Sequence, residues 1–164
     1  MSDKVALITP SFNRAYIIGE TAASIFAQTH ENWEWVIVDD GSTDESWELI
    51  QSYAEKDPRV KGFQRNRGPK GACTCRNIAV EKTNADWLIF LDTDDLLHPD
   101  CLKQRLATAQ SAGENEVLYF PILIFEESLE ECHLWDDTEH PTEWLEGVLN
   151  MRPPVQGSGT FWPR

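Results

Sequence analysis

Short apolar stretches alternate with helical stripes along the first two-thirds of the chain. Three stretches, at residues 5–8, 35–38 and 87–91, are apolar throughout, and a fourth at 60–64 is weaker. Continuous apolar runs of this length are typical of strands that are buried on both faces of a parallel sheet. We predict four such strands, and a fifth at 117–125 that Pro121 places at an edge of the sheet.

The segments between these strands have apolar residues at helical spacing. Ile18, Ala22 and Ile25 recur at i, i+4 and i+7, the period of one helix face. Similar stripes follow the later strands, at Trp47, Ile50 and Ala54, at Ile78 and Ala79, and at Leu102, Leu106 and Ala109. Ser42 and Glu45 have the spacing of a capping box that would begin the second helix, and Pro99 suits the first turn of the last.

Alternating strands and helices predict an α/β fold. Its mostly parallel central sheet is covered by helices on both faces, which makes a three-layer sandwich. The chain has 164 residues and no internal repeat, so we expect residues 1–164 to form a single domain.

Composition narrows the class of protein. The formal net charge of −14 argues against a general nucleic-acid binder, because neutralising phosphates requires Lys and Arg. No apolar run approaches the ~18 residues of a membrane span. Cys73, Cys75, Cys101 and Cys132 have neither zinc-site spacing nor the pattern of a small secreted domain, so we expect free thiols in the cytoplasm.

Acidic residues follow two of the predicted strands. Segment 39–42 reads Asp-Asp-Gly-Ser and segment 92–95 reads Asp-Thr-Asp-Asp, and the segment 9–14 follows the first strand. Because the carboxyl ends of parallel strands meet at one edge of a sheet, these segments should share a site. The carboxylates suit a hard divalent cation there, although each pair alone is also typical of helix caps and turns.

A basic segment lies between the two acidic ones in sequence. Residues 61–76 carry five Lys or Arg side chains and no acid, together with Gly68 and Gly71. Backbone N–H groups at a helix start, with Arg76, can face a diphosphate. A carboxylate-bound cation and this segment together would hold a nucleotide diphosphate.

Four motifs in this order resemble the family 2 glycosyltransferases. They are Ile-Thr-Pro-Ser-Phe-Asn-Arg at 8–14, Val-Asp-Asp-Gly-Ser-Thr-Asp at 38–44, Gly71-Ala72 with Arg76-Asn77, and Phe-Leu-Asp-Thr-Asp-Asp at 90–95. The final residues 157–164 resemble a further strand of that family. The resemblance implies the GT-A fold and transfer of a sugar from a nucleotide sugar, most often UDP-linked, to an acceptor hydroxyl with inversion.

The resemblance also implies roles for individual residues. Those matching the nucleoside loop are Pro10, Ser11, Asn13 and Arg14. Asp39 matches the carboxylate that accepts a hydrogen bond from the base, whereas Asp40 is expected to support the turn. Arg76 matches a position near the phosphates. Segment 92–94 matches the D-x-D element of the family. Asp92 and Thr93 would meet the ribose or sugar, and Asp94, with the following Asp95, would bind Mn²⁺ or Mg²⁺.

The family's catalytic base is an acid beyond the strand that Phe161 and Trp162 begin. No residue here matches it, so we expect it beyond Arg164 and expect this domain to be truncated at its C-terminus. The acceptor, whether glycan, lipid-linked or protein, and the oligomeric state stay open. We expect a cytoplasmic protein, which an acceptor or regions outside this chain would bring to the inner face of the membrane.

Two other functions stay open. The first is a non-catalytic nucleotide-sugar-binding fragment, because no base is matched. The second is a Mg²⁺-dependent phosphoryl-transfer domain. That interpretation leaves Asn13 and Arg14 unexplained, and the sequence lacks the Lys and the Ser or Thr that such sites place after a later strand.

Overall fold

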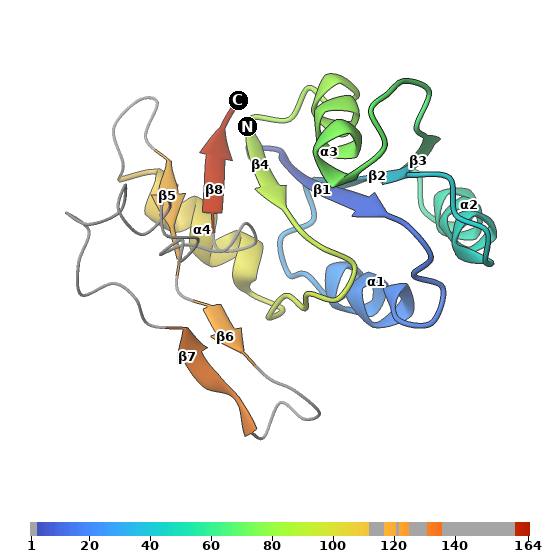
Figure 1. The fold of residues 1–164 in the computed structure, drawn as a ribbon. Coiled ribbons are helices and arrows are strands. Elements are labelled where there is room, and N and C mark those ends of the chain that lie inside the picture. Colours follow the sequence, from blue (N-terminus) through green and yellow to red (C-terminus); the bar gives the residue numbers. More distant parts are fainter. Residues whose placement is uncertain (1–2, 112–116, 121, 125–130, 136–159) are drawn as a thin grey trace, which may run out of the picture.

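The computed structural model describes residues 3–111, 117–120, 122–124, 131–135 and 160–164 (Figure 1). Strands and helices alternate through the first part of this chain. In order they are β1 (Val5–Ser11), α1 (Ile18–Phe26), β2 (Trp33–Asp39), α2 (Ser46–Lys56), β3 (Val60–Gln64), α3 (Ala72–Glu81), β4 (Trp87–Phe90) and α4 (Cys101–Ala109). The short strands β5 (Leu118–Tyr119), β6 (Ile122–Ile124), β7 (His133–Trp135) and β8 (Thr160–Pro163) follow.

The main sheet has the strand order β3-β2-β1-β4-β8-β5. Strands β3, β2, β1 and β4 are mutually parallel, and β8 runs antiparallel to both of its neighbours. Ser11 pairs with Asp39, and Asp39 with Gln64, so three strands end in one row. The predicted mostly parallel sheet, and the meeting of its carboxyl ends at one edge, are confirmed.

Helices cover both faces of the sheet, as the apolar strands predict. Val5 and Leu7 of β1 pack into a core with α1, α2 and α4, whereas Ala6 and Ile8 point to the other face and pack with α3. In Figure 1, α3 lies above the sheet and α1 and α2 below it. Successive side chains of a strand alternate between faces, so each strand serves both cores.

The starts of two helices differ from prediction. The predicted capping box is wrong, because α2 begins at Ser46 and the Ser42 hydroxyl donates to Asp39 instead of accepting a hydrogen bond from a backbone N–H of the helix. The Asp44 carboxylate accepts a hydrogen bond from the Ser46 backbone N–H at 3.1 Å. Helix α4 begins at Cys101, so Pro99 precedes it and does not form its first turn.

The predicted fifth strand is divided. β5 pairs with β8 at the edge of the main sheet, while β6 pairs with β7 in a separate two-stranded sheet. Pro121, which lies outside the described residues, falls between β5 and β6. The strand expected at the end of the chain is confirmed as β8.

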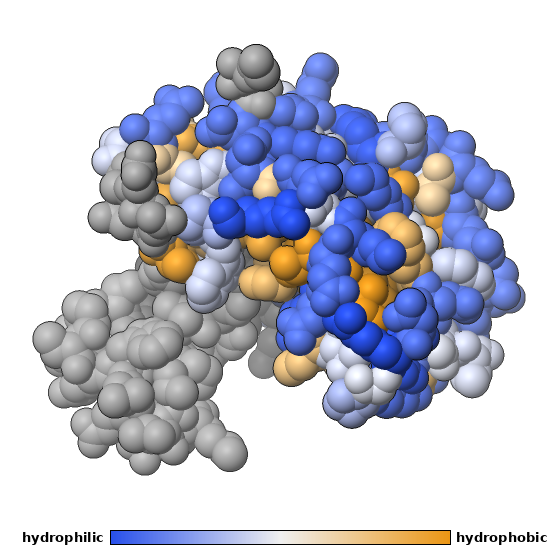
Figure 2. Space-filling model, turned by 90° about the horizontal axis from the view of Figure 1, so that it is seen from above, coloured by the Kyte–Doolittle hydropathy of each residue, from blue (hydrophilic) through white to orange (hydrophobic). Residues whose placement is uncertain are grey.

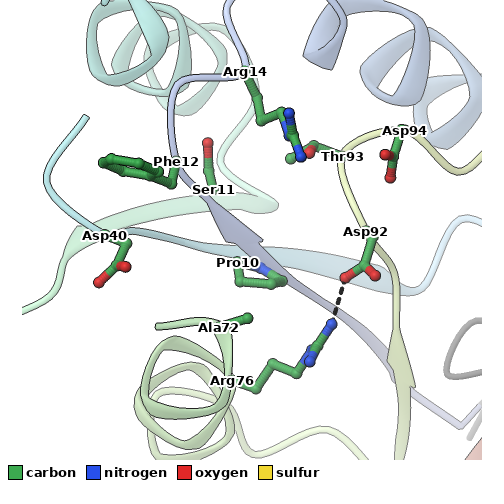
Figure 3. A pocket seen from close by; sticks show the side chains of 10 residues that line it. All are labelled: Pro10, Ser11, Phe12, Arg14, Asp40, Ala72, Arg76, Asp92, Thr93 and Asp94. Atoms are coloured by element: carbon green, nitrogen blue, oxygen red, sulfur yellow. Dashed lines mark hydrogen bonds and ion pairs between the residues drawn. The ribbon is translucent and has the colours of Figure 1, made fainter. Parts of the chain in front are cut away.

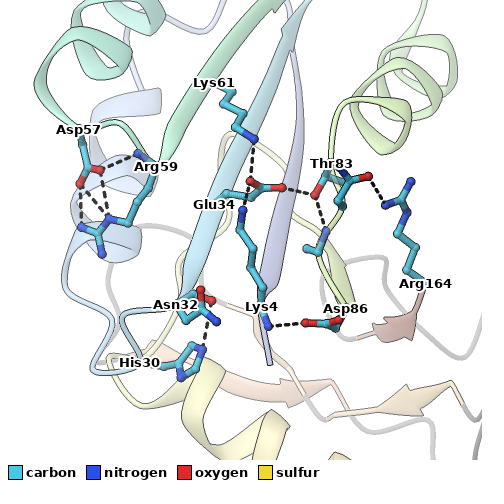
Figure 4. Close-up of polar contacts among 12 residues, drawn as sticks. Lys4, His30, Asn32, Glu34, Asp57, Arg59, Lys61, Thr83, Asp86 and Arg164 are labelled. Carbon is cyan, nitrogen blue, oxygen red and sulfur yellow. Dashed lines mark hydrogen bonds and ion pairs between the residues drawn. The ribbon is translucent and has the colours of Figure 1, made fainter. Parts of the chain in front are cut away.

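A polar cluster joins strands at the amino end of the sheet, opposite the acidic motifs (Figure 4). Glu34 of β2 is buried and accepts hydrogen bonds from Lys4 Nζ at 2.5 Å, from Lys61 Nζ at 2.8 Å and from the Thr83 hydroxyl. Burial acts to raise the pKa of Glu34, but the hydrogen bonds from Lys4, Lys61 and Thr83 outweigh it and lower the pKa. The paired charge makes burial of this carboxylate tolerable.

Seen from the side of α3, the described surface is mostly hydrophilic, with small separate hydrophobic areas (Figure 2). Within the described residues, no helix is long and apolar enough to cross a membrane. All four cysteines are free thiols, as predicted.

Candidate functional site

A pocket of about 260 Å³ lies where β1 and β4 end (Figure 3). From β1 the chain crosses to β2 on one side along the sheet, and from β4 it continues to β5 on the other side. Open α/β sheets bind ligands at the point where the strand order reverses in this way. Among the described residues, the pocket is lined by Pro10, Ser11, Phe12, Arg14, Asp40, Ala72, Arg76, Asp92, Thr93 and Asp94. Phe12 and Asp40 lie at one side, Asp92 and Asp94 at the opposite side.

Asn13 holds the loop after β1 against the loop after β2. Its φ of 52° is in the left-handed region, which Asn tolerates better than most residues. Its backbone N–H donates to Ser42 Oγ at 2.9 Å, and its Oδ1 accepts from the Thr43 N–H at 2.8 Å. Asn13 does not line the pocket, and its described side-chain contact is with the neighbouring loop.

Asp39 and Asp40 follow β2 and have different partners. Asp39 Oδ2 accepts hydrogen bonds from the N–H groups of Gly41 and Ser42, each at 3.0 Å, and Oδ1 accepts one from the Ser42 hydroxyl. Asp39 is fully buried, whereas Asp40 lines the pocket and forms an ion pair with Arg65. Asp39, and not Asp40 as expected, therefore stabilises the turn; contact of Asp39 with a base stays a prediction.

Arg14 projects into the pocket from the loop after β1 and points toward Thr93. Its backbone N–H donates to Ser46 Oγ at 2.8 Å, and Ser46 Oγ donates to Asp44 Oδ1 at 2.6 Å. Burial acts to raise the pKa of Asp44, but hydrogen bonds from Ser46 and from the Ala15 N–H outweigh it and lower that pKa. The start of α2 thus anchors the loop that carries Arg14.

Arg76 reaches across the floor of the pocket from α3. Its Nη2 is 2.6 Å from Asp92 Oδ1, and its Nε is buried with no hydrogen-bond partner among the described residues. The Ser11 hydroxyl, also on the pocket wall, is likewise buried and has no partner in the described part of the chain. Buried polar groups are nearly always paired, so both atoms are suited to contact a bound ligand.

The three acids after β4 have separate roles. Asp92 pairs with Arg76, and its N–H donates to Asp95 Oδ2 at 3.3 Å, so Asp95 closes the turn and does not line the pocket. Asp94 is exposed at the pocket and makes no hydrogen bond or ion pair with the described residues. No group of three or more His, Cys, Asp or Glu side chains within the described part of the chain is placed to hold a metal ion.

Cys75 lies beside this site and is fully buried on α3. Burial, and then the charge of the nearby Asp40, raise the pKa of its thiol to about 11. The thiol is therefore protonated at neutral pH and unsuited to act as a nucleophile.

Most of the predicted site residues meet at the pocket. Those that line it are Pro10, Ser11, Arg14, Arg76, Asp92, Thr93 and Asp94; those that do not are Asn13, Asp39 and Asp95. Phe12, Asp40 and Ala72 line it without having been predicted. Each is adjacent in sequence to a predicted residue or part of a quoted motif, so the signal was the motif and not the individual side chain.

Known proteins resemble this chain across the same region. The family model for glycosyl transferase family 2 matches residues 6–136. An uncharacterized glycosyltransferase of Haemophilus influenzae is 38% identical over 104 residues, which is 62% of this chain and 40% of that protein. The putative teichuronic acid biosynthesis glycosyltransferase TuaG of Bacillus subtilis is 37% identical over 102 residues, again 62% of this chain and 40% of that protein. The chain thus spans about 40% of the length of these two relatives.

Solved structures agree on the fold. S. aureus TarS in complex with UDP has a TM-score of 0.66 and 27% identity, covering 73% of this chain and 35% of that one. Mannosyltransferase PcManGT from Pyrobaculum calidifontis has a TM-score of 0.67 and 17% identity, covering 100% of this chain and 45% of that one. These are glycosyltransferases of the GT-A fold. With the matched model covering most of its residues, this chain belongs to glycosyl transferase family 2.

Proposed function

We propose that the pocket binds the nucleotide diphosphate of a nucleotide sugar, with UDP as the nucleotide, and that the domain takes part in sugar transfer from it. The observation that carries this proposal is the arrangement around the pocket. Arg14 and Arg76 flank it, Asp94 faces it without a partner among the described residues, and the helix α3 begins at its wall with Ala72. Cationic side chains and a helix N-terminus are suited to a diphosphate.

The two sides of the pocket suit the two ends of the ligand. Phe12 is 41% exposed and offers a ring face to a base, beside the Asp40 carboxylate as a hydrogen-bond acceptor. Asp40 lines the pocket and Asp39 does not, so we assign the base-facing role to Asp40. The diphosphate would then lie between Arg76 and Asp94, with Asp92 near the ribose or sugar.

Asp94 suits Mn²⁺ or Mg²⁺, because its carboxylate lines the pocket and has no partner among the described residues. One carboxylate is a small share of a coordination shell, so diphosphate oxygens and water would supply the rest. When bound, the cation would offset the charge that develops on the leaving diphosphate. Asp95 would support the turn and not bind the metal, since its Oδ2 accepts the Asp92 N–H.

Transfer with inversion needs a base that takes the proton of the acceptor hydroxyl. We propose an acid outside residues 1–164 for this role, with a glycan, a lipid carrier or a protein as the acceptor. The relatives are longer than this chain, which leaves room for such a residue.

Calorimetry with UDP, with and without Mn²⁺, tests the proposal. We expect binding that Mn²⁺ strengthens. A phosphoryl-transfer domain would show no preference for UDP over inorganic phosphate with Mg²⁺, and this result would overturn the proposal. Release of UDP from a UDP-sugar then separates a transferase from a fragment that only binds the donor.

A further inference from the structure

Helix α1 and the residues just after it carry a polar stripe in addition to the apolar one. Thr21, Ser24 and Gln28 lie at i, i+3 and i+7 and therefore share one side of the helical path. Thr21 and Gln28 are buried and Ser24 is half-buried. A buried polar group is costly unless it is paired, so the partners of these three side chains matter. We call Thr21, Ser24 and Gln28 the α1 polar stripe.

The first residue of the α1 polar stripe, Thr21, contacts the turn that carries Asp94. Thr21 Oγ1 lies 2.8 Å from the Thr93 carbonyl oxygen and 3.1 Å from that of Asp95, so its hydroxyl donates to this pair of acceptors. The residue between them is Asp94. A single buried hydroxyl thus binds the main chain on both sides of the pocket carboxylate.

The other two side chains hold the continuation of the same segment. Ser24 Oγ accepts a hydrogen bond from the Leu97 N–H at 3.2 Å. Gln28 Nε2 donates to the His98 carbonyl oxygen at 2.8 Å, and Gln28 Oε1 accepts from the Leu102 N–H at 3.1 Å.

These contacts matter because segment 93–100 has no regular secondary structure. Irregular backbone needs partners other than a helix or strand ladder, and here α1 supplies them over more than one helical turn. Ser24 and Thr21 are also joined, because Ser24 Oγ donates to the Thr21 carbonyl oxygen at 2.8 Å.

We propose that the α1 polar stripe consists of positioning residues, which place Asp94 in the pocket by holding the main chain of 93–102. The inference rests on the proposed function, since the cation and diphosphate are the ligands that Asp94 would meet. Positioning groups held by their own contacts give a site its geometry, and a loss of about 1 Å in placement is costly. Thr21 acts through the backbone and is not itself a catalytic residue.

Thr21→Val tests this directly, since it removes the hydroxyl at nearly constant volume, and Thr21→Ser restores it. Calorimetry with and without Mn²⁺ measures how much the metal increases the affinity for UDP, which we call the Mn²⁺-dependent gain. We expect Thr21→Val to reduce this gain about tenfold and Thr21→Ser to stay within about twofold of the wild type. UDP affinity without metal should be unchanged in both, which a general loss of structure would not leave intact.

Thr108→Val is a control for the same substitution away from the pocket, because among the described residues the Thr108 hydroxyl donates within α4, to the Gln104 carbonyl oxygen at 3.2 Å. We expect it to behave as wild type. Hydrogen exchange of the Leu97 amide without ligand gives a second readout, and it should be faster in Thr21→Val and normal in Thr21→Ser. If Thr21→Val does not fold, Ser24→Ala should show the same loss in smaller degree.

If folded Thr21→Val keeps the full gain in UDP affinity that Mn²⁺ brings, the inference is overturned while the proposed function stands. The same holds if Thr21→Ser loses as much of this gain as Thr21→Val does. Failure of the wild type to bind UDP with Mn²⁺ overturns the proposed function, and the inference with it. The two failures are therefore distinguishable.

Discussion

Asp94 differs from its two acidic neighbours in what its oxygens contact. Asp92 is paired with Arg76 at 2.6 Å, and Asp95 accepts the Asp92 N–H at 3.3 Å. Asp94 is exposed at the pocket wall with no partner among the described residues. At the residue scale, the three acids after β4 therefore separate into an ion-pair partner, a pocket-facing acid and a turn-closing acid.

Replacing Asp94 with Asn should abolish the strengthening of UDP binding by Mn²⁺, because the neutral amide is a much weaker metal ligand than a carboxylate. Calorimetry with and without the metal measures it. Asp86→Asn is the control, since Asp86 lies at the opposite edge of the sheet, where it accepts the Lys4 N–H at 2.8 Å. Normal Mn²⁺-dependent binding by Asp94→Asn would show that the metal assignment is wrong.

Asp40→Asn and Asp39→Asn should separate ligand contact from turn stability. We expect Asp40→Asn to weaken uridine binding about tenfold, as the loss of a charged hydrogen-bond acceptor does. Asp39→Asn should instead lower the melting temperature more than Asp40→Asn, because Asp39 accepts three hydrogen bonds within its turn. If Asp39→Asn weakened uridine binding at an unchanged melting temperature, Asp39 would be the residue that faces the base.

Arg76→Ala should reduce UDP affinity more than uridine affinity, since the guanidinium would contact phosphates and not the nucleoside. Titrations of both ligands into one variant give the comparison. Arg59→Ala is a matched control, because Arg59 pairs with Asp57 at 2.7 Å away from the pocket. An equal loss for UDP and uridine would exclude a phosphate contact.

At the scale of elements, the two ends of the parallel strands differ in the contacts that they make. The carboxyl ends carry the pocket, whereas the amino ends are tied together around Glu34 of β2 (Figure 4). Lys4 precedes β1, Lys61 belongs to β3 and Thr83 follows α3, so one buried carboxylate connects separate elements. None of these three partners of Glu34 lines the pocket.

Glu34→Gln should therefore lower the free energy of unfolding at pH 7 by roughly 1.5–3 kcal/mol, the range of a charged hydrogen bond. The folded-state pKa of Glu34 lies below its ordinary value of 4.5, so its contribution is present above pH 4.5 and is lost as the pH falls through the folded-state pKa. Urea unfolding of both proteins at pH 7 and at pH 3.5 checks this. A difference that stayed constant or grew toward low pH would contradict it.

At the scale of the whole molecule, an acidic chain with a net charge of −14 is compatible with an anionic ligand. The pocket is lined by Arg14 and Arg76 together with three acids, two of which are paired: Asp40 with Arg65 and Asp92 with Arg76. Asp39 and Asp95 contact turns and do not line the pocket, so among the described residues Asp94 is the lining acid without a partner. A field at a site depends on which charges face it and not on their sum.

The strands, the helices and the order of the motifs were predictable, because apolar runs and helical stripes are local properties of the sequence. The bounds of β3, 60–64, were predicted without error, and β1 and β2 were each only extended. The start of α2 was not predicted correctly. Ser42 forms a hydrogen bond with Asp39 across the turn, and the spacing of Ser42 and Glu45 does not reveal this competing local contact.

The sequence by itself determined the α/β class, the parallel sheet and the edge at which acids and bases would meet, since the period of the pattern selects strand or helix and parallel strands share an end. Only the tertiary structure decided which acid faces the pocket. Asp39 and Asp40, or Asp94 and Asp95, are adjacent and chemically identical, and their directions depend on backbone turns and on partners distant in sequence. The contact of Thr21 with the carbonyl oxygens around Asp94 spans more than 70 residues of chain, so no local pattern could reveal it.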